Sequence, residues 1–559
     1  MNFIARNRCA SVVVWAVILS ALAFLVADRQ QHNGYFNWRT NLWADQAGYY
    51  VYSPAFFIYG FDAARLPENI TAITGDGFSV NENGKIITRY TSGVAMMQAP
   101  VFLAVHLTAG LTGQKQDGFS GIYHWIPSIA AVLYSFLGMM LLWYYLKFYF
   151  NRRVAFFSIL TIFLGTNLLY YTIDATGMSH IYSFFLFSVL LVVSKLFFTE
   201  HKPQKQTLYF LLVALTSAMI ILVRPTNLAF VGLVFLLDIS SWKEFRLRLQ
   251  KIFRIKYILI LVLSLFIVFL PQMLYWKYSS GSYFTDSYEG YGFSNWASPE
   301  IIPFLFSPNN GLFPYNPVYF LILAALGYMI WKKNLNGYFI LLVFLGLVYV
   351  FSSWFIFSFG CGFGSRNFVE YTAVFTLPLG FFYHDVSKRS RWIIIFPVIF
   401  VLINLKLLYS YDKCFNSGNW DWKEYVYLLK HTKYQQEYHY LSPMVLGSGQ
   451  EYTPANRVKA DQVTKVNFRR AVVTTNFRTF SRETEAVVVL QIETGDSILY
   501  WNGIRLVDET DNKEPGKKLK KKADFGLPRH YSTDAVISTF IWNIGKDSLH
   551  ISKMEVYLE

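Results

Sequence analysis

The sequence predicts an α-helical membrane protein of about eleven transmembrane helices that ends in an extracytoplasmic β-sandwich-like domain. Charged residues make up only 15% of the 559 residues, whereas hydrophobic residues make up 54%. Residues 1–410 contain repeated apolar runs close to the ~20 residues that cross a bilayer. From residue 411 onward polar and apolar positions alternate as they do in soluble domains. The chain therefore holds a membrane module and a separate, smaller domain.

The membrane module is predicted to begin with a span at Ser11–Ala27, which follows Arg6 and Arg8. A cleaved signal peptide is the alternative for this run. The other ten predicted spans are 122–146, 154–172, 181–198, 208–223, 228–241, 257–276, 317–331, 338–357, 371–384 and 392–409. The uncharged run 93–111 is of similar length. Counting it as a span would break the alternation between cation-rich and cation-poor loops along the chain. We expect an amphipathic helix at the membrane interface there.

The connections between the runs alternate in charge. Cations cluster at 147–153, 202–205, 243–256, 332–333 and 388–391, whereas the alternate connections hold few. By the positive-inside rule, the N-terminus is cytoplasmic and the C-terminal domain lies outside the inner or plasma membrane, in the periplasm if the cell is Gram-negative. Membrane orientation thus accounts for much of the net charge of +15, and we expect no nucleic-acid partner.

Two outer loops, 28–118 and 277–316, are long enough to suggest a function. Beyond the membrane module, residues 411–440 are predicted to form a helical linker and residues 441–559 a β-rich domain. Period-2 segments predict strands at 471–476, 485–492, 497–501, 536–542 and 549–556. Turn signals stand at 501–503 and 543–545. The lysine-rich run 517–522 is interpreted as a solvated loop, with anionic headgroups as the alternative partner.

Asp45 is the first candidate for a catalytic residue. It lies in the sequence Trp-Ala-Asp-Gln-Ala-Gly-Tyr-Tyr, which ends with Tyr49 and Tyr50 at the start of the first outer loop. The aromatic residues that follow favour the membrane interface, which would hold the Asp45 carboxylate near the headgroup plane. The alternative role for this aspartate is a helix N-cap.

Several outer cations are candidates for binding an anion. Arg224 precedes Pro225, and Arg366 ends a glycine-rich segment at 359–367. Arginine suits phosphate because its planar guanidinium group can donate hydrogen bonds to two phosphate oxygens. A structural ion pair is the alternative for Arg224. Lys85 and Arg89 precede the expected interfacial helix, although Lys85 also fits a snorkelling side chain.

Three further residues are weaker candidates for contacting substrate. They are His180, Asp286 and Glu289, for which a structural role or simple solvation are the alternatives. The three cysteines and ten histidines show no ligand spacing, so we predict no structural zinc site.

Taken in order along residues 1–410, these motifs resemble the GT-C superfamily of membrane glycosyltransferases, which includes protein O-mannosyltransferases and lipid A aminoarabinose transferases. Asp45 is similar to the family's acid in the first outer loop. The segments 89–100, 224–227, 307–317 and 364–366 resemble its basic-aromatic, Arg-Pro, Ser-Pro…Gly-Leu…Pro and Gly-x-Arg elements. The single acid departs from the paired acid of many members, so a divalent cation is left open but not indicated. No other cofactor is implied.

The resemblance implies a GT-C-like fold and transfer of a hexose or pentose from a polyprenyl-phosphate donor to a lipid, glycan or protein acceptor. The transfer would occur outside the membrane by inverting displacement. Asp45 would be the general base. The carrier phosphate would bind Arg366, Arg224, Arg89 and Lys85, and the substrates would contact Tyr49, Tyr50, His180, Asp286 and Glu289.

Two other functions stay open at this point. A flippase or transporter of lipid-linked glycans needs ionisable residues near the middle of its spans, and these spans hold almost none. A polysaccharide polymerase or ligase would use the same donor, but it would depend on outer arginine and histidine residues rather than on Asp45.

Overall fold

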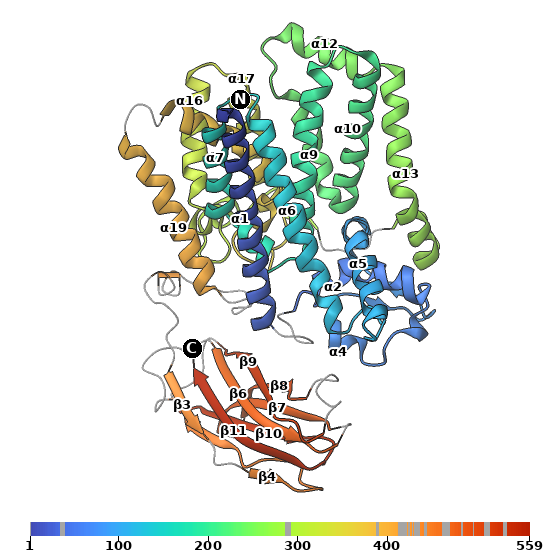
Figure 1. Cartoon of the computed structure of the whole chain (residues 1–559), viewed down its shortest axis with the longest axis vertical. Helices are drawn as coiled ribbons and strands as arrows, with labels where there is room; N and C mark the ends of the chain where they lie inside the picture. The colour runs from blue at the N-terminus through green and yellow to red at the C-terminus, as the bar shows by residue number, and fades with distance from the viewer. Residues whose placement is uncertain are drawn as a thin grey trace. The chain divides into compact units, whose positions relative to one another are not determined.

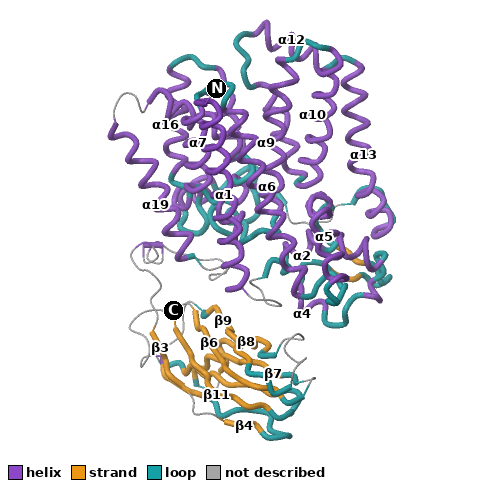
Figure 2. Tube along the Cα trace, viewed as in Figure 1, coloured by secondary structure: helices purple, strands orange, loops and turns teal. Residues whose placement is uncertain are grey.

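The computed structural model describes most of the chain: residues 2–33, 40–285, 292–360, 362–386, 391–411, 422, 425–426, 429, 436–440, 444–460, 470–481, 484–495, 497–507, 515–528 and 534–558. The chain divides into two compact units, Met1–Tyr409 and Ser410–Glu559. Figure 2 shows helices throughout the first unit and strands throughout the second. This division confirms the predicted fold class, a helical membrane module with a C-terminal β-rich domain.

Helices form in all eleven predicted apolar runs of the first unit. They are α1 (Asn2–Asn33), α6 (Trp125–Leu146), α7 (Arg152–Gly165), α8 (Leu168–Ile173), α9 (Ser179–Thr199), α10 (Pro203–Val223), α11 (Leu228–Val231), α13 (Ile255–Ser280), α16 (Val318–Trp331), α17 (Leu335–Ser352), α18 (Thr372–Phe381) and α19 (Ile395–Ser410). The polar helix α12 (Trp242–Ile252) connects the region after α11 to α13.

Eight helices in the described part of the chain are long and apolar enough to cross a membrane. Seven coincide with predicted spans, and the eighth is α5 (Gly93–Leu111). The predicted spans 154–172, 228–241, 317–331 and 371–384 instead form shorter or interrupted helices. In the first of these, the helix breaks at Thr166, and the Asn167 amide donates to Asn316 Oδ1 at 2.6 Å. The count of eleven spans therefore remains a prediction.

The helix α5 contacts its neighbours at one end of the bundle. Gly93 approaches Val223, the last residue of α10, and Gln98 Nε2 donates to the hydroxyl of Tyr182 in the first turn of α9 at 2.6 Å. A three-residue connection makes α9 and α10 antiparallel neighbours, so the end of α10 and the start of α9 lie at the same level. These contacts place the start of α5 at that end of the bundle, and the interfacial position of the helix remains a prediction.

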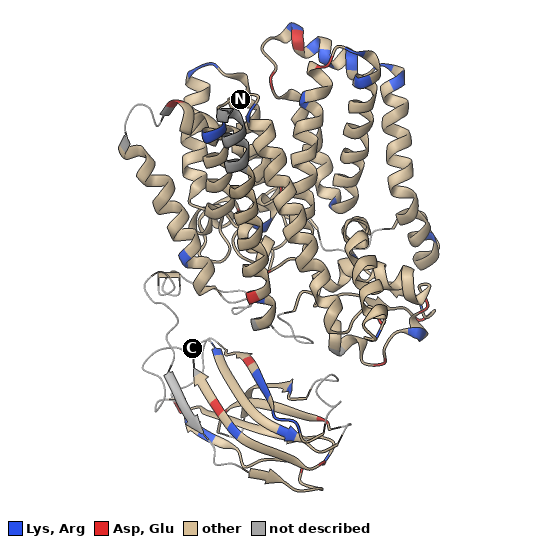
Figure 3. Cartoon of the chain, in the orientation of Figure 1, with Lys and Arg blue, Asp and Glu red and all other residues tan. Residues whose placement is uncertain are grey.

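The first outer loop folds into short elements at the same end. They are α2 (Asp45–Tyr50), α3 (Tyr52–Pro54), α4 (Ile70–Thr74) and a hairpin of β1 (Ser79–Val80) and β2 (Ile86–Ile87). The second long loop contributes α14 (Ile301–Phe306) and α15 (Leu312–Tyr315). Figure 3 shows lysine and arginine gathered around α12, at the opposite end of this unit from α2 and α4. This separation follows the charge alternation of the sequence.

The second unit is a sandwich of two antiparallel sheets. One sheet has the strand order β5-β10-β7-β8, and the other has the order β3-β11-β6-β9 with β4 paired to β11. Val473 and Ile551 from one sheet and Val488 and Leu490 from the other share one buried core. The strands are β3 (Gln436–Tyr440), β4 (Met444–Leu446), β5 (Asn456–Lys459), β6 (Arg470–Thr479), β7 (Ala486–Thr494), β8 (Ser497–Arg505), β9 (Leu519–Gly526), β10 (Val536–Asn543) and β11 (Leu549–Leu558).

All five predicted strands are present in this unit, and three other expectations need correction. The turn predicted at 501–503 is wrong, because β8 continues through Gly503, over which the Trp501 ring folds. The lysine-rich run is not a loop from Leu519 onward, because its later residues form β9 and pair with β6. The predicted helical linker ends before residue 436, where β3 begins.

Candidate active site

The candidate residues come from five segments that meet at the end of the bundle where α5 lies. Asp45 and Tyr49 stand on α2, and Tyr90 precedes α5. His180 lies in the first turn of α9, and Arg224 directly follows α10. Arg366 begins a short 3-10 helix, η6 (Arg366–Phe368), which leads into α18. Hydrogen bonds and ion pairs join these segments into one polar cluster.

Asp45 forms the exposed part of this cluster. Its Oδ1 atom accepts a hydrogen bond from the Tyr90 hydroxyl at 2.5 Å, and its Oδ2 atom lies 3.6 Å from Arg366 Nη1. The Asp45 side chain is 42% exposed and that of Arg366 is 19% exposed. The N-cap position of α2 is Ala44, so Asp45 is the first residue of the helix and not its cap. The carboxylate is thus both paired and open to an incoming molecule.

Glycines allow the segments around Asp45 to approach this closely. A Cβ atom on Gly48 would lie 2.3 Å from the Gly77 carbonyl oxygen and 2.5 Å from the Tyr90 ring. Only glycine therefore lets the Tyr90 ring reach across α2 to Asp45. The same ring packs against the Tyr49 ring, tilted by 35° with 4.2 Å between centroids. The sequence Gly-Tyr after Asp45 thus builds the aromatic wall of the site.

Behind Asp45, Arg224 lies within a buried network. Its Nε atom is 3.2 Å from Glu370 Oε1, its Nη1 atom is 2.8 Å from His180 Nδ1, and its Nη2 group donates to Asn367 Oδ1 at 2.7 Å. Glu370 Oε2 lies 3.0 Å from His180 Nδ1, and both side chains are fully buried. The carboxylate expected to accompany Arg224 is therefore Glu370, and the structural ion pair is present.

Two tyrosines connect the exposed and buried parts of the cluster. The Tyr49 hydroxyl accepts a hydrogen bond from Ser179 Oγ at 3.1 Å, next to His180. Burial raises the pKa of the Tyr49 hydroxyl, and the nearby Arg224 charge only partly offsets this effect. The Tyr171 ring lies 4.9 Å from the His180 ring. A Cβ atom on Gly362 would lie 2.8 Å from the hydroxyl oxygen of Tyr171. Gly362 therefore lets the glycine-rich loop that carries Arg366 close against Tyr171.

Glu370 is a site residue that the sequence analysis did not identify. Burial raises the pKa of its carboxyl to about 7, although Arg224 and Arg366 act in the opposite direction. One sequence signal was present. Glu370 is an acid four residues after Arg366, at the start of an apolar run, and ionisable residues at such positions tend to be paired and functional.

Other predicted site residues lie elsewhere or have other partners. Lys85 Nζ donates to the Tyr278 carbonyl oxygen at 2.6 Å and sits over the Tyr278 ring, so the end of α13 holds its ammonium group. Arg89 is exposed beside Tyr90 in the chain. Tyr50 does not face the site as expected, because it is fully buried and its hydroxyl donates to the Gly118 carbonyl oxygen at 2.6 Å. Asp286 and Glu289 lie outside the described residues.

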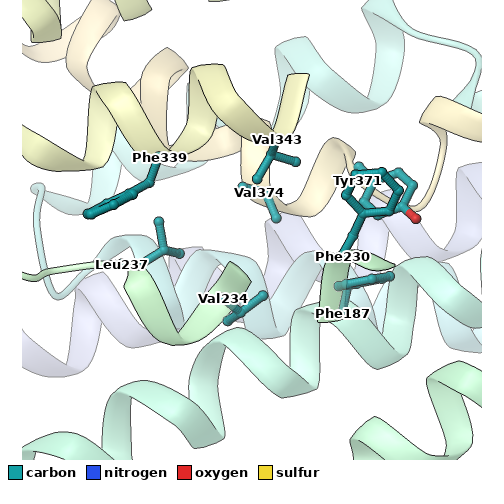
Figure 4. A pocket seen from close by; sticks show the side chains of 8 residues that line it. All are labelled: Phe187, Phe230, Val234, Leu237, Phe339, Val343, Tyr371 and Val374. Atoms are coloured by element: carbon teal, nitrogen blue, oxygen red, sulfur yellow. The ribbon is translucent and has the colours of Figure 1, made fainter. Parts of the chain in front are cut away.

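An apolar pocket adjoins the buried network. Tyr371, which directly follows Glu370, forms one end of it, and Figure 4 shows Phe187 and Phe230 beside the Tyr371 ring. The Tyr371 hydroxyl donates to Asn227 Oδ1 at 2.6 Å. The remaining lining residues are Val234, Leu237, Phe339, Val343 and Val374. A charged cluster and an apolar pocket therefore lie next to each other within the helical unit.

No family model and no curated protein sequence matches the chain. Two solved structures are among those that resemble it. The structure of ArnT from Cupriavidus metallidurans bound to undecaprenyl phosphate is 14% identical, with a TM-score of 0.47 over 72% of this chain and 65% of that one. The Archaeoglobus fulgidus oligosaccharyltransferase complex with zinc and sulfate is 13% identical, with a TM-score of 0.39 over 69% of this chain and 52% of that one.

The chain thus spans about 65% of the length of ArnT.

Proposed function

We propose that this protein transfers a sugar from a polyprenyl-phosphate donor to a lipid, glycan or protein acceptor at the extracytoplasmic membrane face. The proposal depends most on one observation. Asp45 and Arg366, which come from opposite halves of the membrane module, lie 3.6 Å apart and are both partly exposed. In this proposal, a base for the acceptor and a cation for the leaving phosphate border the same site, and the bound sugar-phosphate lies between them.

In the proposed reaction, Asp45 accepts the proton of the acceptor hydroxyl or amine. The acceptor atom bonds to the anomeric carbon from the face opposite the phosphate, while the bond between that carbon and the phosphate oxygen breaks. The electron pair leaves with the polyprenyl phosphate, so the configuration inverts. Arg366 stabilises the negative charge that develops on the phosphate, and preorganised cations of this kind are usually the largest catalytic contribution. Phosphate is a good leaving group, so the reaction does not require a general acid.

The proposal predicts the behaviour of Asp45→Asn. Asparagine keeps the shape of the side chain but cannot accept the acceptor proton, and loss of a general base costs about 10²–10⁴-fold in rate. Cells that lack the chain should lose one sugar from a surface lipid, glycan or protein, as measured by mass spectrometry of the cell envelope. The wild-type chain should restore that sugar and Asp45→Asn should not.

Asp76→Asn is the matched control, because Asp76 is an exposed carboxylate in the same loop. It should restore the sugar fully. Restoration by Asp45→Asn at a near wild-type rate would disprove the role of Asp45.

One observation favours a second function, that of a polysaccharide polymerase or ligase with the same donor. Such an enzyme depends on outer arginine and histidine residues, and Arg224 lies 2.8 Å from His180. It would transfer a polymer block instead of a single sugar, and it would fail in His180→Ala but survive Asp45→Asn. The same mass spectra separate the two functions, because a lost block and a lost single residue differ in mass.

A further inference from the structure

Glu370 is shared between two basic side chains and has no access to solvent. Its two carboxyl oxygens lie 3.2 Å from Arg224 Nε and 3.0 Å from His180 Nδ1. A buried carboxylate is costly unless its charge is compensated. The proposed chemistry in the preceding section uses Asp45 and Arg366 but gives no role to Glu370, although it is the most deeply buried acid of the cluster.

The charges of the described cluster balance when both of its acids are ionised. Asp45 and Glu370 then offset Arg224 and Arg366. A phosphodiester brings one more negative charge into this neutral site. One added proton would restore the balance, and the net charge is the same whether that proton sits on Glu370 or on His180 Nδ1.

We propose that Glu370 is a positioning residue of the phosphate site that takes up a proton when the donor phosphate binds. Protonation releases Arg224 from its ion pair, so that its charge becomes available to the anion. The inference rests on the proposed function, because it requires a phosphate at this cluster. It adds a coupling between donor binding and pH.

Groups from every packed element face Glu370, and they support this role. Arg224 follows α10, His180 belongs to α9 and Arg366 to η6. Phenols approach from α8, α16 and the residue before α18, and phenols are uncharged near neutral pH. They are those of Tyr171, Tyr319 and Tyr371. Arg224 and Arg366 are therefore the charged groups that face Glu370, and the buried imidazole of His180 is neutral in this range.

Two further observations support the proposal, one for the anion and one for the proton. Asn367 Nδ2 is buried and has no hydrogen-bond partner among the described residues, while Oδ1 of the same side chain accepts from Arg224. A phosphate oxygen would satisfy this donor. Burial also raises the pKa of the Glu370 carboxyl to about 7, so a proton is readily gained near neutral pH.

The test measures proton uptake directly. The probe is methyl farnesyl phosphate, a prenyl phosphodiester whose charge stays at −1 near neutral pH, binding to the full-length chain in detergent. Calorimetry between pH 6 and pH 8 in buffers of different ionisation enthalpy should show net proton uptake when the probe binds, because an ionised Glu370 gains a proton. The anion favours the protonated form, so Kd should rise about fivefold to tenfold from pH 6 to pH 8.

Glu370→Gln should abolish both effects, because glutamine fixes the neutral form. It should bind the probe at pH 8 as tightly as the wild-type chain does at pH 6. Glu300→Gln is the matched control, since Glu300 is an exposed acid of the second outer loop, and it should behave as wild type.

Binding without proton uptake in the wild-type chain, or uptake that persists in Glu370→Gln, would overturn the inference and leave the proposed function standing. Absence of probe binding at every pH would instead count against the proposed function. If Glu370→Gln does not fold, the wild-type uptake and pH dependence decide the matter.

Discussion

At the scale of single residues, Tyr90 would control how Asp45 is presented to an acceptor in the proposed reaction. Its hydroxyl donates to Asp45 Oδ1 at 2.5 Å, and its ring is fixed by packing against the Tyr49 ring and by the close approach of Gly48. This hydrogen bond holds the plane of the carboxylate, with Oδ2 directed toward Arg366. A positioned base of this kind is worth more than a freely rotating one, because orientation is set before the reaction.

Tyr90→Phe should therefore slow transfer about tenfold while leaving donor affinity nearly unchanged. A hydrogen bond to a charged group contributes about 1.5–3 kcal/mol, and each 1.36 kcal/mol is a factor of ten in rate. The measurement is kcat and KM for the sugar donor once that donor is identified. Tyr59→Phe is the control, because the Tyr59 hydroxyl donates to the Asp117 backbone carbonyl. Equal rates in Tyr90→Phe and wild type would show that Tyr90 does not orient Asp45.

The sequence alone predicted Asp45, Arg224 and Arg366 because each is an unusual residue in its immediate surroundings. An acid beside aromatic residues and cations on a cation-poor side are local signals. The role of Glu370 is not local, because its partners Arg224 and His180 lie in distant segments. Tyr50 was misjudged for the same reason, since only the fold shows that it faces Gly118 and not the site.

At the scale of elements, the position of α5 depends on one glycine. A Cβ atom on Gly93 would lie 2.7 Å from the Val223 backbone nitrogen and 2.8 Å from its Cα atom. These are backbone atoms and cannot rotate away. Thr91 Oγ1 also donates to the Leu222 carbonyl oxygen, which ties the start of α5 to the end of α10. Arg224 is the next residue after Val223, so this contact also positions the buried network.

Gly93→Ala should therefore lower both thermal stability and transfer activity. Forcing one extra carbon into a packed contact costs about 1–3 kcal/mol, and the shift of α10 would displace Arg224. Gly327→Ala, in α16, is the control because nothing lies within 4 Å of the added atom. Alanine favours a helix over glycine by about 1 kcal/mol, so the control should be as stable as wild type or more so. The stability of the two variants and the wild type is compared by measuring the melting temperatures of the purified proteins in one detergent.

The apolar runs predicted where helices form, but they did not predict where the helices break. The run 154–172 reads as one span, yet its chain breaks at Thr166, where the Asn167 backbone amide is satisfied by Asn316 from a distant loop. An apolar pattern records burial and contains no information about such a partner. In the β unit, the period-2 strands were found, whereas β9 was hidden by lysines that alternate between exposed and half-buried positions.

At the scale of the whole molecule, the proposed reaction requires that Asp45 and Arg366 face the outside of the cell. The cations of the sequence favour that orientation, because α12 and its neighbours carry most of the lysines and arginines of one end of the bundle. The cluster that contains Asp45 lies at the other end, beside α5. Orientation in the membrane therefore decides whether lipid-linked sugars on the outer face can reach the site.

Single cysteines should report this orientation. After the native cysteines are replaced by serine, Asp76→Cys in the first outer loop and Ser294→Cys in the second should react with a membrane-impermeant maleimide in intact spheroplasts. Lys243→Cys, on α12, should react only after the membrane is permeabilised. All three positions are exposed, so a difference in labelling reflects the membrane and not burial. If Asp76→Cys stays unlabelled until permeabilisation while Lys243→Cys reacts at once, the site faces the cytoplasm and transfer on the outer face is excluded.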